Sequence, residues 1–345
     1  MLPRLMMHLL WFTALMIGPV GAHVALWQPG REARPLSTGD TLLPVVMRFG
    51  GDLLPGGSYE AAVDDSADFA FRDFNLFRSA DISMVNLESP VTLRGMAVKK
   101  PFNFRVKPEF VAALASAGIS VVNIANNHIY DFGSEGLFDT ILYLDSLKIQ
   151  HVGAGRNYRD AHRAAVFNIR GNRIGILGYY GGGEAPGATR KNPGVAHRLL
   201  ADIRNDIDSL RSRDSAEYVV VNFHWGRELA DAPDGEQQNL AHQVIDAGAN
   251  AIIGHHPHVL QGIEWYHGGV IVYSLGNLLF GGNARSTYST GVFEIRFDGH
   301  RAAYRFIPVS VVNWRLSVAS GVEAAEIMDH VKELSSAFSH TIFTK

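Results

Sequence analysis

Three histidines, His255, His256 and His258, follow an apolar run that is typical of a buried strand and ends at Gly254. Neutral imidazole is the commonest protein ligand of zinc, manganese and iron. Residues i and i+2 of an extended segment lie on the same side, so we expect the rings of His256 and His258 to converge. The alternative is a surface histidine cluster beside a turn that Pro257 stiffens. The stretch therefore predicts either part of a metal site or an ordinary turn.

Polar residues also follow earlier strand-like runs in the chain. Such runs lead into Asp52, Glu88, the pair Asn127-His128, and His224. Each position alone has an ordinary explanation as a turn residue. Buried parallel strands, however, bring their carboxyl ends to one edge of a sheet. Taken together, the five strand ends predict one constellation of side chains at that edge.

This constellation has the composition of a hydrolytic metal site. Its six candidate ligands are Asp52, Glu88, Asn127, His224, His256 and His258. Their number suits two adjacent divalent ions, which lower the pKa of bound water and stabilise charge on attacking and leaving oxygens. His128 would protonate the leaving group, with Asp131 orienting its ring. The expected reaction is phosphoester hydrolysis, with amide hydrolysis as an alternative.

The chain has no cysteine, which excludes thiolate ligands and favours Mn, Fe or Zn held by nitrogen and oxygen atoms. Hydrophobic residues make up 47% of its 345 residues and charged residues 19%, so it can bury a full core and is not a disordered protein. The formal net charge of -3 gives no basic footprint for nucleic acid. We therefore expect a folded protein that does not bind nucleic acid.

Alternating strand and helix patterns must position these residues, which predicts an α/β fold. Helices are expected over 68–79, 108–118, 136–147, 201–211, 237–247 and 323–338, and a hairpin over 290–312 turned at Asp298-Gly299. The glycine-rich segment 179–193 lacks the Lys-Ser/Thr ending of a phosphate-binding loop and is predicted to be a mobile loop over the site. Lys99 and Lys100 could approach an anionic substrate, but a solvated turn is the preferred interpretation.

The amino-terminal region indicates export. No charged residue occurs from Leu5 to Gly30, and an apolar core is followed by the small residues Gly21 and Ala22. This is the layout of a secretory signal cleaved after Ala22, although the span could also serve as an uncleaved membrane anchor. We assign 1–30 to this signal or anchor, 31–44 to a linker, and 45–289 to the main domain. Residues 290–345 would complete that domain with the hairpin and the last helix.

Five short motifs in one order suggest a family. They are Asn86-Leu87-Glu88, Ala125-Asn126-Asn127-His128-x-x-Asp131-x-Gly133, His224-Trp225-Gly226-x-Glu228, Gly254-His255-His256-Pro257-His258 and Tyr273-Ser274-Leu275-Gly276-Asn277. The set resembles the bacterial capsule-synthesis family CapA, or PGA_cap, which is associated with poly-γ-glutamate capsules. That family is similar to the calcineurin-like metallophosphoesterases. The resemblance covers roughly residues 45–281.

The resemblance implies a metallophosphoesterase-like αββα sandwich with mixed sheets. It also implies the same six metal ligands, with Glu88 near the metal-bridging position. Further site residues would be Asn86, Glu228, His255, Ser274 and Asn277. The usual histidine two residues after the first aspartate is absent, because Leu53 and Leu54 follow Asp52, and Glu88 replaces the usual Gly-Asp motif. The resemblance therefore leaves open whether the site takes one ion or two.

As function, the family implies an extracytoplasmic protein that assembles, releases or anchors an anionic polymer, with membrane-bound synthase subunits as expected partners. One alternative is a non-catalytic accessory subunit that binds polymer or synthase. Another is an extracytoplasmic phosphodiesterase unrelated to capsule.

Overall fold

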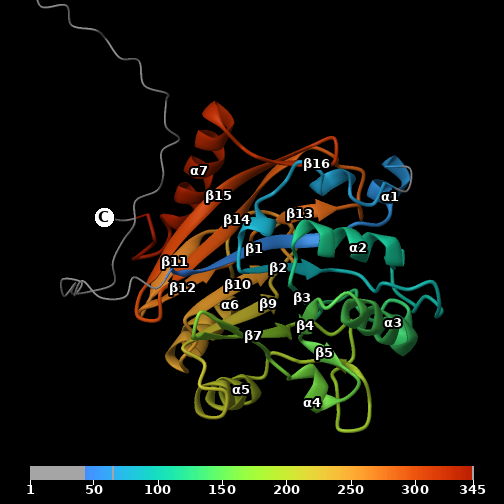
Figure 1. Cartoon of the computed structure of the whole chain (residues 1–345), viewed down its shortest axis with the longest axis horizontal. Coiled ribbons are helices and arrows are strands. Elements are labelled where there is room, and N and C mark those ends of the chain that lie inside the picture. Colours follow the sequence, from blue (N-terminus) through green and yellow to red (C-terminus); the bar gives the residue numbers. More distant parts are fainter. Residues whose placement is uncertain (1–42, 64–65, 344–345) are drawn as a thin grey trace, which may run out of the picture.

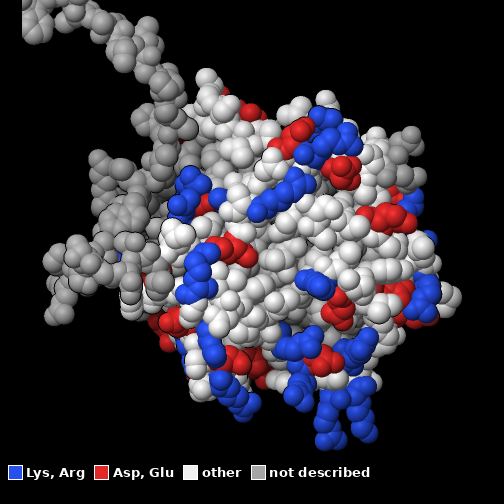
Figure 2. All heavy atoms as spheres, viewed as in Figure 1, with Lys and Arg blue, Asp and Glu red and all other residues white. Residues whose placement is uncertain are grey.

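The computed structural model describes residues 43–63 and 66–343. The signal or anchor expected over 1–30 and nearly all of the linker expected over 31–44 lie outside these ranges. Within them, no helix is both long and apolar enough to cross a bilayer. On the face drawn in Figure 2, basic and acidic side chains are interspersed.

Two mixed β-sheets form the centre of the protein (Figure 1). The eight-stranded sheet has the order β16-β15-β14-β1-β2-β3-β4, with β13 pairing to β1. Its strands are β1 (Val45–Leu54), β2 (Ile82–Leu87), β3 (Val121–Asn123), β4 (Gln150–Val152), β13 (Asn277–Phe280), β14 (Tyr288–Phe297), β15 (Ala302–Val312) and β16 (Arg315–Val318). Strands β1, β2, β3, β4 and β13 run parallel to their neighbours among these, whereas β14 runs antiparallel to β1 and β15.

The six-stranded sheet has the order β11-β12-β10-β9-β7-β6. Its strands are β6 (Ala165–Ile169), β7 (Asn172–Tyr180), β9 (Tyr218–His224), β10 (Ala251–His255), β11 (Ile263–Tyr266) and β12 (Gly269–Val272). The central strands β7, β9, β10 and β12 are parallel, and the outer strands β6 and β11 are antiparallel to their neighbours. A small separate sheet pairs β5 (Ala154–Gly155) with β8 (Gly194–Val195).

The side-chain alternation of the strands divides the core into layers. Met84 of β2 and Val220 of β9 belong to the hydrophobic cluster between the two sheets. Val85 instead packs with helices α2 (Pro108–Ala117) and α3 (Gly133–Ser146). Val221 packs with α5 (Leu200–Ser212) and α6 (Gly235–Asp246). Successive strand residues face opposite sides, so central strands such as β2 and β9 are buried on both faces. The predicted αββα sandwich with mixed sheets is confirmed.

Most helices lie within a few residues of their expected bounds, but the helix expected over 68–79 is wrong. The segment forms two 3-10 turns, Phe69–Phe71 and Phe77–Ser79. Phe71, Phe74 and Phe77 are buried at a spacing of three residues, which matches 3.0 residues per turn better than 3.6. Two further short helices are α1 (Ser58–Ala62) and α4 (Tyr158–Ala161).

The carboxyl-terminal region packs on the same sandwich. Strands β14 and β15 form the expected hairpin, and β14 pairs with the whole first half of β1. The last helix, α7 (Gly321–Ser335), contributes Ile327 and Val331 to the core between the sheets. The site-bearing strand β1 is therefore held on both sides along its length.

Candidate metal centre

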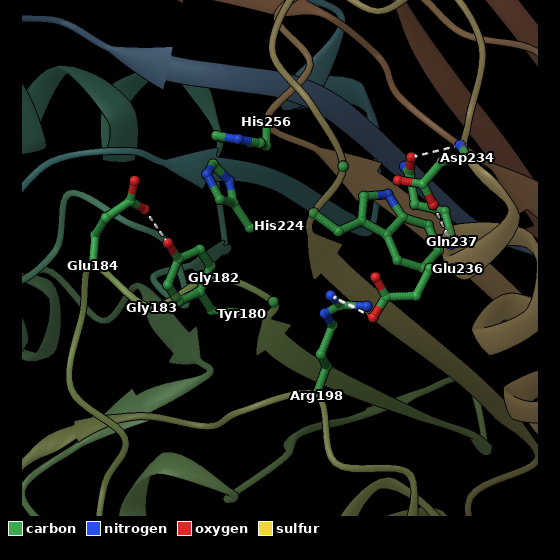
Figure 3. Close-up of a pocket in the computed structure, with 13 residues that line it drawn as sticks. Tyr180, Gly182, Gly183, Glu184, Arg198, His224, Asp234, Glu236, Gln237 and His256 are labelled. Carbon is green, nitrogen blue, oxygen red and sulfur yellow. Dashed lines mark hydrogen bonds and ion pairs between the residues drawn. The ribbon is translucent and has the colours of Figure 1, made fainter.

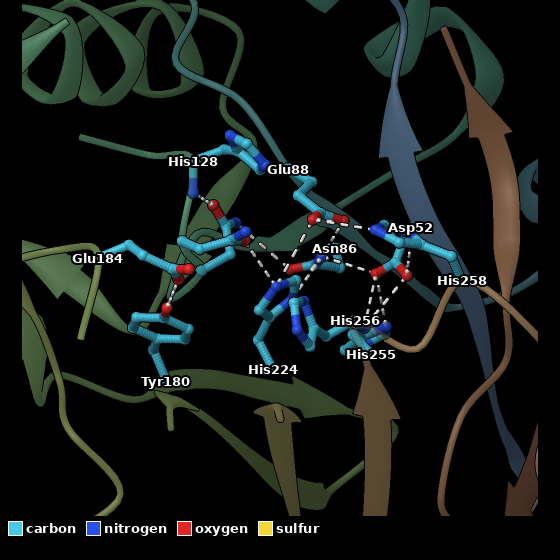
Figure 4. Close-up of polar contacts among 12 residues, drawn as sticks. Asp52, Asn86, Glu88, His128, Tyr180, Glu184, His224, His255, His256 and His258 are labelled. Atoms are coloured by element: carbon cyan, nitrogen blue, oxygen red, sulfur yellow. Dashed lines mark hydrogen bonds and ion pairs between the residues drawn. The ribbon is translucent and has the colours of Figure 1, made fainter. Parts of the chain in front are cut away.

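The candidate residues come from both sheets, not from one sheet edge. Asp52 lies near the end of β1 and Glu88 directly after β2, both in the eight-stranded sheet. His224 ends β9 in the six-stranded sheet, and His256 follows the end of β10 there. The expectation of a single sheet edge is therefore wrong. The carboxyl ends of parallel strands in two facing sheets converge instead (Figure 4).

Close backbone packing positions Asp52. A Cβ atom added at Gly51 would lie 1.9 Å from the carbonyl oxygen of Gly276, and the amide of Asp52 donates to that oxygen at 2.8 Å. In the resulting register, Asp52 stands opposite Asn86 on one neighbouring strand and Asn277 on the other. Only glycine at position 51 permits this approach, which places three polar side chains next to one another.

Asn86 is the central hydrogen-bonding group of the site. Its amide oxygen accepts from Nδ2 of Asn123 at 2.9 Å, so its own Nδ2 faces the other way. This nitrogen donates to Oδ1 of Asp52 at 2.8 Å and lies 3.1 Å from Nδ1 of His224. Oε2 of Glu88 is 3.4 Å away. Asp52, Glu88 and His224 form one group whose ligand atoms lie within 4.8 Å of one another, and the amide nitrogen of Asn86 contacts all three side chains.

The second group with metal-ligand spacing is Glu88, His256 and His258, again with ligand atoms within 4.8 Å of one another. Oε1 of Glu88 and Nδ1 of His256 are buried without a hydrogen-bond partner among the described residues. Unpaired buried acceptors of this kind are costly unless a cation binds them. A carboxylate and two imidazoles also form a donor set that suits Mn, Fe or Zn. This second group therefore fits a divalent ion better than the first.

The two histidines converge for a different reason from the one expected. Strand β10 ends at His255, and His256 and His258 adopt the left-handed region with φ of 98° and 60°. They therefore do not lie on an extended segment. Such backbone conformations are uncommon outside glycine and occur preferentially at functional sites.

Neighbouring groups orient His258. Its Nδ1 lies 2.8 Å from Oδ1 of Asn277 and 3.2 Å from Oδ2 of Asp52, so this nitrogen carries the proton and donates. The other nitrogen, Nε2, lies 3.6 Å from Oε1 of Glu88. Hydrogen bonding of one ring nitrogen to a carboxylate or amide is the usual way in which a ligating histidine is oriented.

Burial and mutual charge set the protonation of these groups. Burial, reinforced by the neighbouring histidines, lowers the pKa of His224 well below its usual value. Burial and then His258 lower the pKa of His256. Burial alone would lower the pKa of His258, but Glu88 and Asp52 outweigh it and raise that pKa to about 10. His224 and His256 are thus neutral at pH 7, which is the form that binds metal, whereas His258 must lose a ring proton when an ion binds.

The pKa values of the two carboxylates, Glu88 and Asp52, are shifted in opposite directions. Burial, together with the charge of Asp52, raises the pKa of Glu88 well above its usual value. For Asp52, burial acts in the upward direction, but the hydrogen bond and charge of His258 prevail and lower the pKa. A cation beside Glu88 would relieve its unfavourable burial.

His128 and Asp131 form a pair at the edge of the metal group. Nδ1 of His128 lies 2.8 Å from Oδ2 of Asp131, and Lys100 forms an ion pair with the same carboxylate. Nζ of Lys100 also donates to the carbonyl oxygen of Asn127 at 2.8 Å. The interpretation of Lys100 as a solvated turn residue is therefore wrong, because its side chain is only 13% exposed. A sequence pattern could not distinguish it from its exposed neighbour Lys99.

Asn127 reaches the site although β3 ends at Asn123, earlier than expected. Its Oδ1 lies 2.8 Å from Nε2 of His224, which joins the two sheets. Asn126, by contrast, turns inward, where its Oδ1 accepts from the amide of His128 at 3.1 Å. Asn126 thus stabilises the loop, whereas Asn127 faces the site.

Three further candidates have other surroundings. Ser274 donates to the carbonyl of Val259 at 2.7 Å and so supports the loop that leads to Asn277. His255 is buried 3.8 Å from Asp52, and burial lowers its pKa to about 4, but it belongs to neither ligand group. Glu228 is exposed, but its negative charge acts to raise the pKa of Glu88 and of His256.

A pocket of roughly 310 Å³ adjoins the site (Figure 3). His224 and His256 form one part of its wall, and the glycine-rich segment contributes Gly181, Gly182 and Gly183. That segment therefore does border the site, as expected. Arg198 also lines the pocket, together with acidic residues and Gln237. Sequence reasoning missed these residues, because they follow no strand end and no motif contains them.

Comparison with known proteins gives consistent matches. A family model described as bacterial capsule synthesis protein PGA_cap matches residues 46–282. The capsule biosynthesis protein CapA of Bacillus anthracis is 33% identical over 282 residues, covering 77% of this chain and 67% of that protein. The PGA biosynthesis protein CapA of Bacillus subtilis is 36% identical over 239 residues, covering 67% of this chain and 62% of that protein.

Among solved structures, a putative 5'-nucleotidase from Staphylococcus aureus aligns with a TM-score of 0.47 and 13% sequence identity. The alignment covers 84% of this chain and 58% of that one.

Proposed function

The chain belongs to the bacterial capsule synthesis protein PGA_cap family, and we propose that it is a metal-dependent hydrolase acting on the capsule polymer. The proposed substrate is poly-γ-glutamate or a related anionic polymer, since one relative is named a PGA biosynthesis protein. Cleavage would serve release or anchoring of chains during capsule assembly.

The observation that supports this proposal is that Glu88 and His256 each have a buried polar atom without a hydrogen-bond partner among the described residues. Oε1 of Glu88 and Nδ1 of His256 are buried without a hydrogen-bond partner among the described residues, beside His258. These three residues would hold the ion, with Asp52 and Asn277 orienting the ring of His258. When bound, a divalent ion at such a site supplies Lewis-acid activation of water and of the substrate oxygen.

The protein's own residues would handle the leaving group. In amide hydrolysis, the water oxygen bonds to the acyl carbon, the C–N bond breaks, the departing nitrogen takes a proton from the protein, and the proton that the water loses restores the donor. His128 would donate that proton, since its other ring nitrogen is held by Asp131 at 2.8 Å. Lys100 would keep the carboxylate of Asp131 in place through their ion pair. The three residues thus form a proton-donating unit beside the ligands.

We further propose an extracytoplasmic location and membrane-bound synthase subunits as partners. A capsule polymer lies outside the cell, and the uncharged amino-terminal stretch has the pattern of a secretory signal or anchor. Fractionation of cells that express the full chain would test the location. Recovery in the cytoplasmic fraction would contradict it.

The test of the hydrolase is metal content and turnover of the purified chain beside a His256→Ala/His258→Ala variant. The matched control is His267→Ala, whose side chain is 66% exposed. We expect bound transition metal and shortening of poly-γ-glutamate in the wild type and the control, with both lost in the double variant. Equal metal content in all three proteins would contradict the site.

Two further results would redirect the proposal. Metal binding without turnover would favour the accessory, non-catalytic subunit. Hydrolysis of a simple phosphodiester without any change in polymer length would favour a phosphodiesterase.

A further inference from the structure

The pocket beside the metal group contains two hydrogen-bond donors without partners. They are Nε of Arg198 and the amide nitrogen Nε2 of Gln237, both buried and unpaired among the described residues. Both residues line the pocket. Gln237 is 2% exposed, so bulk water cannot readily satisfy its amide. A buried donor without a partner destabilises the protein. The pocket is therefore suited to a ligand that brings acceptor oxygens.

Arg198 is held in position but weakly paired. Its guanidinium packs over Gly181, where an added Cβ would lie 2.1 Å from Nε. Its ion pair is with Glu236 at 2.9 Å, and the side chain of Glu236 is 71% exposed (Figure 3). Exposed ion pairs contribute little stability, so an incoming anion can replace this carboxylate at low cost.

The acidic residues of the pocket are already engaged. Glu184 accepts a hydrogen bond from the hydroxyl of Tyr180. Asp234 caps helix α6 by accepting from the amide of Gln237 at 2.8 Å. The donors of Arg198 and Gln237 thus remain unpaired, whereas the carboxylates of Glu184 and Asp234 have partners. The ligand that completes this pattern is an acceptor, not a cation.

We propose that Arg198 and Gln237 form a subsite for a carboxylate group of the substrate, next to His224 and the proposed metal ligand His256. The inference rests on the proposed function and adds to it the part of the substrate that is recognised. A planar carboxylate matches the fork of a guanidinium. A phosphate dianion fits less well, because three carboxylates, Glu184, Asp234 and Glu236, line the pocket beside one arginine. Each γ-linked glutamyl unit carries one free α-carboxylate beside its amide link, which is the required group.

The test uses the full chain loaded with Mn²⁺ and two probes, tri-γ-glutamate and its α-carboxamide analogue. Binding is measured by calorimetry in a His128→Ala background, which slows cleavage of the probe. We expect Arg198→Gln to weaken tri-γ-glutamate binding about 10- to 100-fold, as for loss of a hydrogen bond to a charged group. The amidated analogue should bind the wild type and the variant with about equal affinity. Arg204→Gln, on the exposed side of α5, is the control.

We expect two more variants to change the affinity for tri-γ-glutamate in opposite directions. Glu236→Gln removes the competing carboxylate and should strengthen tri-γ-glutamate binding about 2- to 5-fold. Gln237→Glu keeps an oxygen to accept the amide of Asp234 but replaces the free donor by an anion, so it should weaken binding. Metal content, measured on every variant, should not change.

Several results would overturn the subsite. One is that Arg198→Gln weakens the binding of both probes equally. Another is that the wild type does not bind tri-γ-glutamate. A third is that inorganic phosphate binds through Arg198 more tightly than the peptide does. The proposed function fails separately. If the wild type binds the carboxylate through Arg198 but cleaves no polymer, the subsite stands and the hydrolase does not. If the wild type cleaves polymer and Arg198→Gln does so equally well, only the subsite is wrong.

Discussion

The amide nitrogen of Asn86 lies 3.1 Å from Nδ1 of His224, and this contact links the two sheets at the centre of the site. Because Asn123 fixes the orientation of the Asn86 amide, Nδ1 of His224 must accept the hydrogen bond. The proton of the neutral ring is then on Nε2, which faces Oδ1 of Asn127 at 2.8 Å. Both ring nitrogens of His224 are thus engaged by protein side chains.

Asn86→Ala tests this relationship. The substitution leaves the buried groups Asp52, Glu88 and His224 without their shared donor, so the metal-free protein should lose about 3 kcal/mol of unfolding free energy. Mn²⁺ should restore more stability to the variant than to the wild type, because the freed ligands can then bind an ion. Thermal unfolding with and without Mn²⁺ measures both effects. Asn205→Ala, at an exposed helix position, is the control. An unchanged metal-free melting temperature would contradict the role of Asn86.

Lys100→Gln should reduce polymer cleavage about 10-fold or more, within the range that positioned acid catalysis contributes, and leave metal content unchanged. The reason is that Lys100 pairs with Asp131, which holds His128. Lys99→Gln removes the same charge one position away, at an exposed side chain, and should have wild-type activity. The two variants are compared by kcat and by metal analysis. Equal activity of both would show that Lys100 has no part in catalysis.

Gly51→Ala should destabilise the fold by about 3 kcal/mol or prevent folding, since overpacking against rigid backbone is costly. Its Cβ would lie 1.9 Å from the carbonyl oxygen of Gly276, at the point where β1 meets β13. Gly235→Ala meets no heavy atom within 4 Å and serves as the control. Urea unfolding measures both. A Gly51 variant of wild-type stability would show that the two strands can separate without cost.

Glu294 should make stability depend on pH in acid. Burial alone would raise its pKa, but hydrogen bonds from Arg48 and Arg296 and the charge of Arg305 lower it. A lowered folded-state pKa means that the stabilisation is complete above the unfolded value of about 4.3 and is lost as the pH falls through the folded value.

Glu294→Gln leaves the buried Arg48 without its carboxylate partner, so the loss of unfolding free energy at pH 7 should be about 3 kcal/mol. The difference from wild type should shrink as the pH falls below about 4, because the wild-type carboxylate is then protonated. Denaturant unfolding from pH 7 to pH 3 measures this, with the exposed Glu326→Gln as control. A difference that stays constant with pH would mean that the charge of Glu294 is not the cause.

Much of the fold could be predicted because hydrophobic patterning is local. The run from Tyr218 to Phe223 is apolar on both sides of the strand, which identifies a strand covered on both faces, and the structure buries every residue of β9. The segment 68–79 could not be predicted in this way. Its phenylalanines at three-residue spacing match a 3-10 turn better than a helix, but residues i and i+3 also share one face of a helix, so only packing selects between them.

The sequence by itself determined which residues could bind a metal, because strand ends and ligand types can be recognised from neighbouring residues. It also identified the family, because its motifs are short and contiguous. Only the tertiary structure decided how these residues are grouped, since Asp52 and His258 are more than 200 positions apart, yet lie 3.2 Å from each other. Only the tertiary structure likewise placed Asn86 within one ligand group and left the donors of Arg198 and Gln237 unpaired. Both depend on which side chain from a distant strand or helix lies opposite, and no local pattern contains that information.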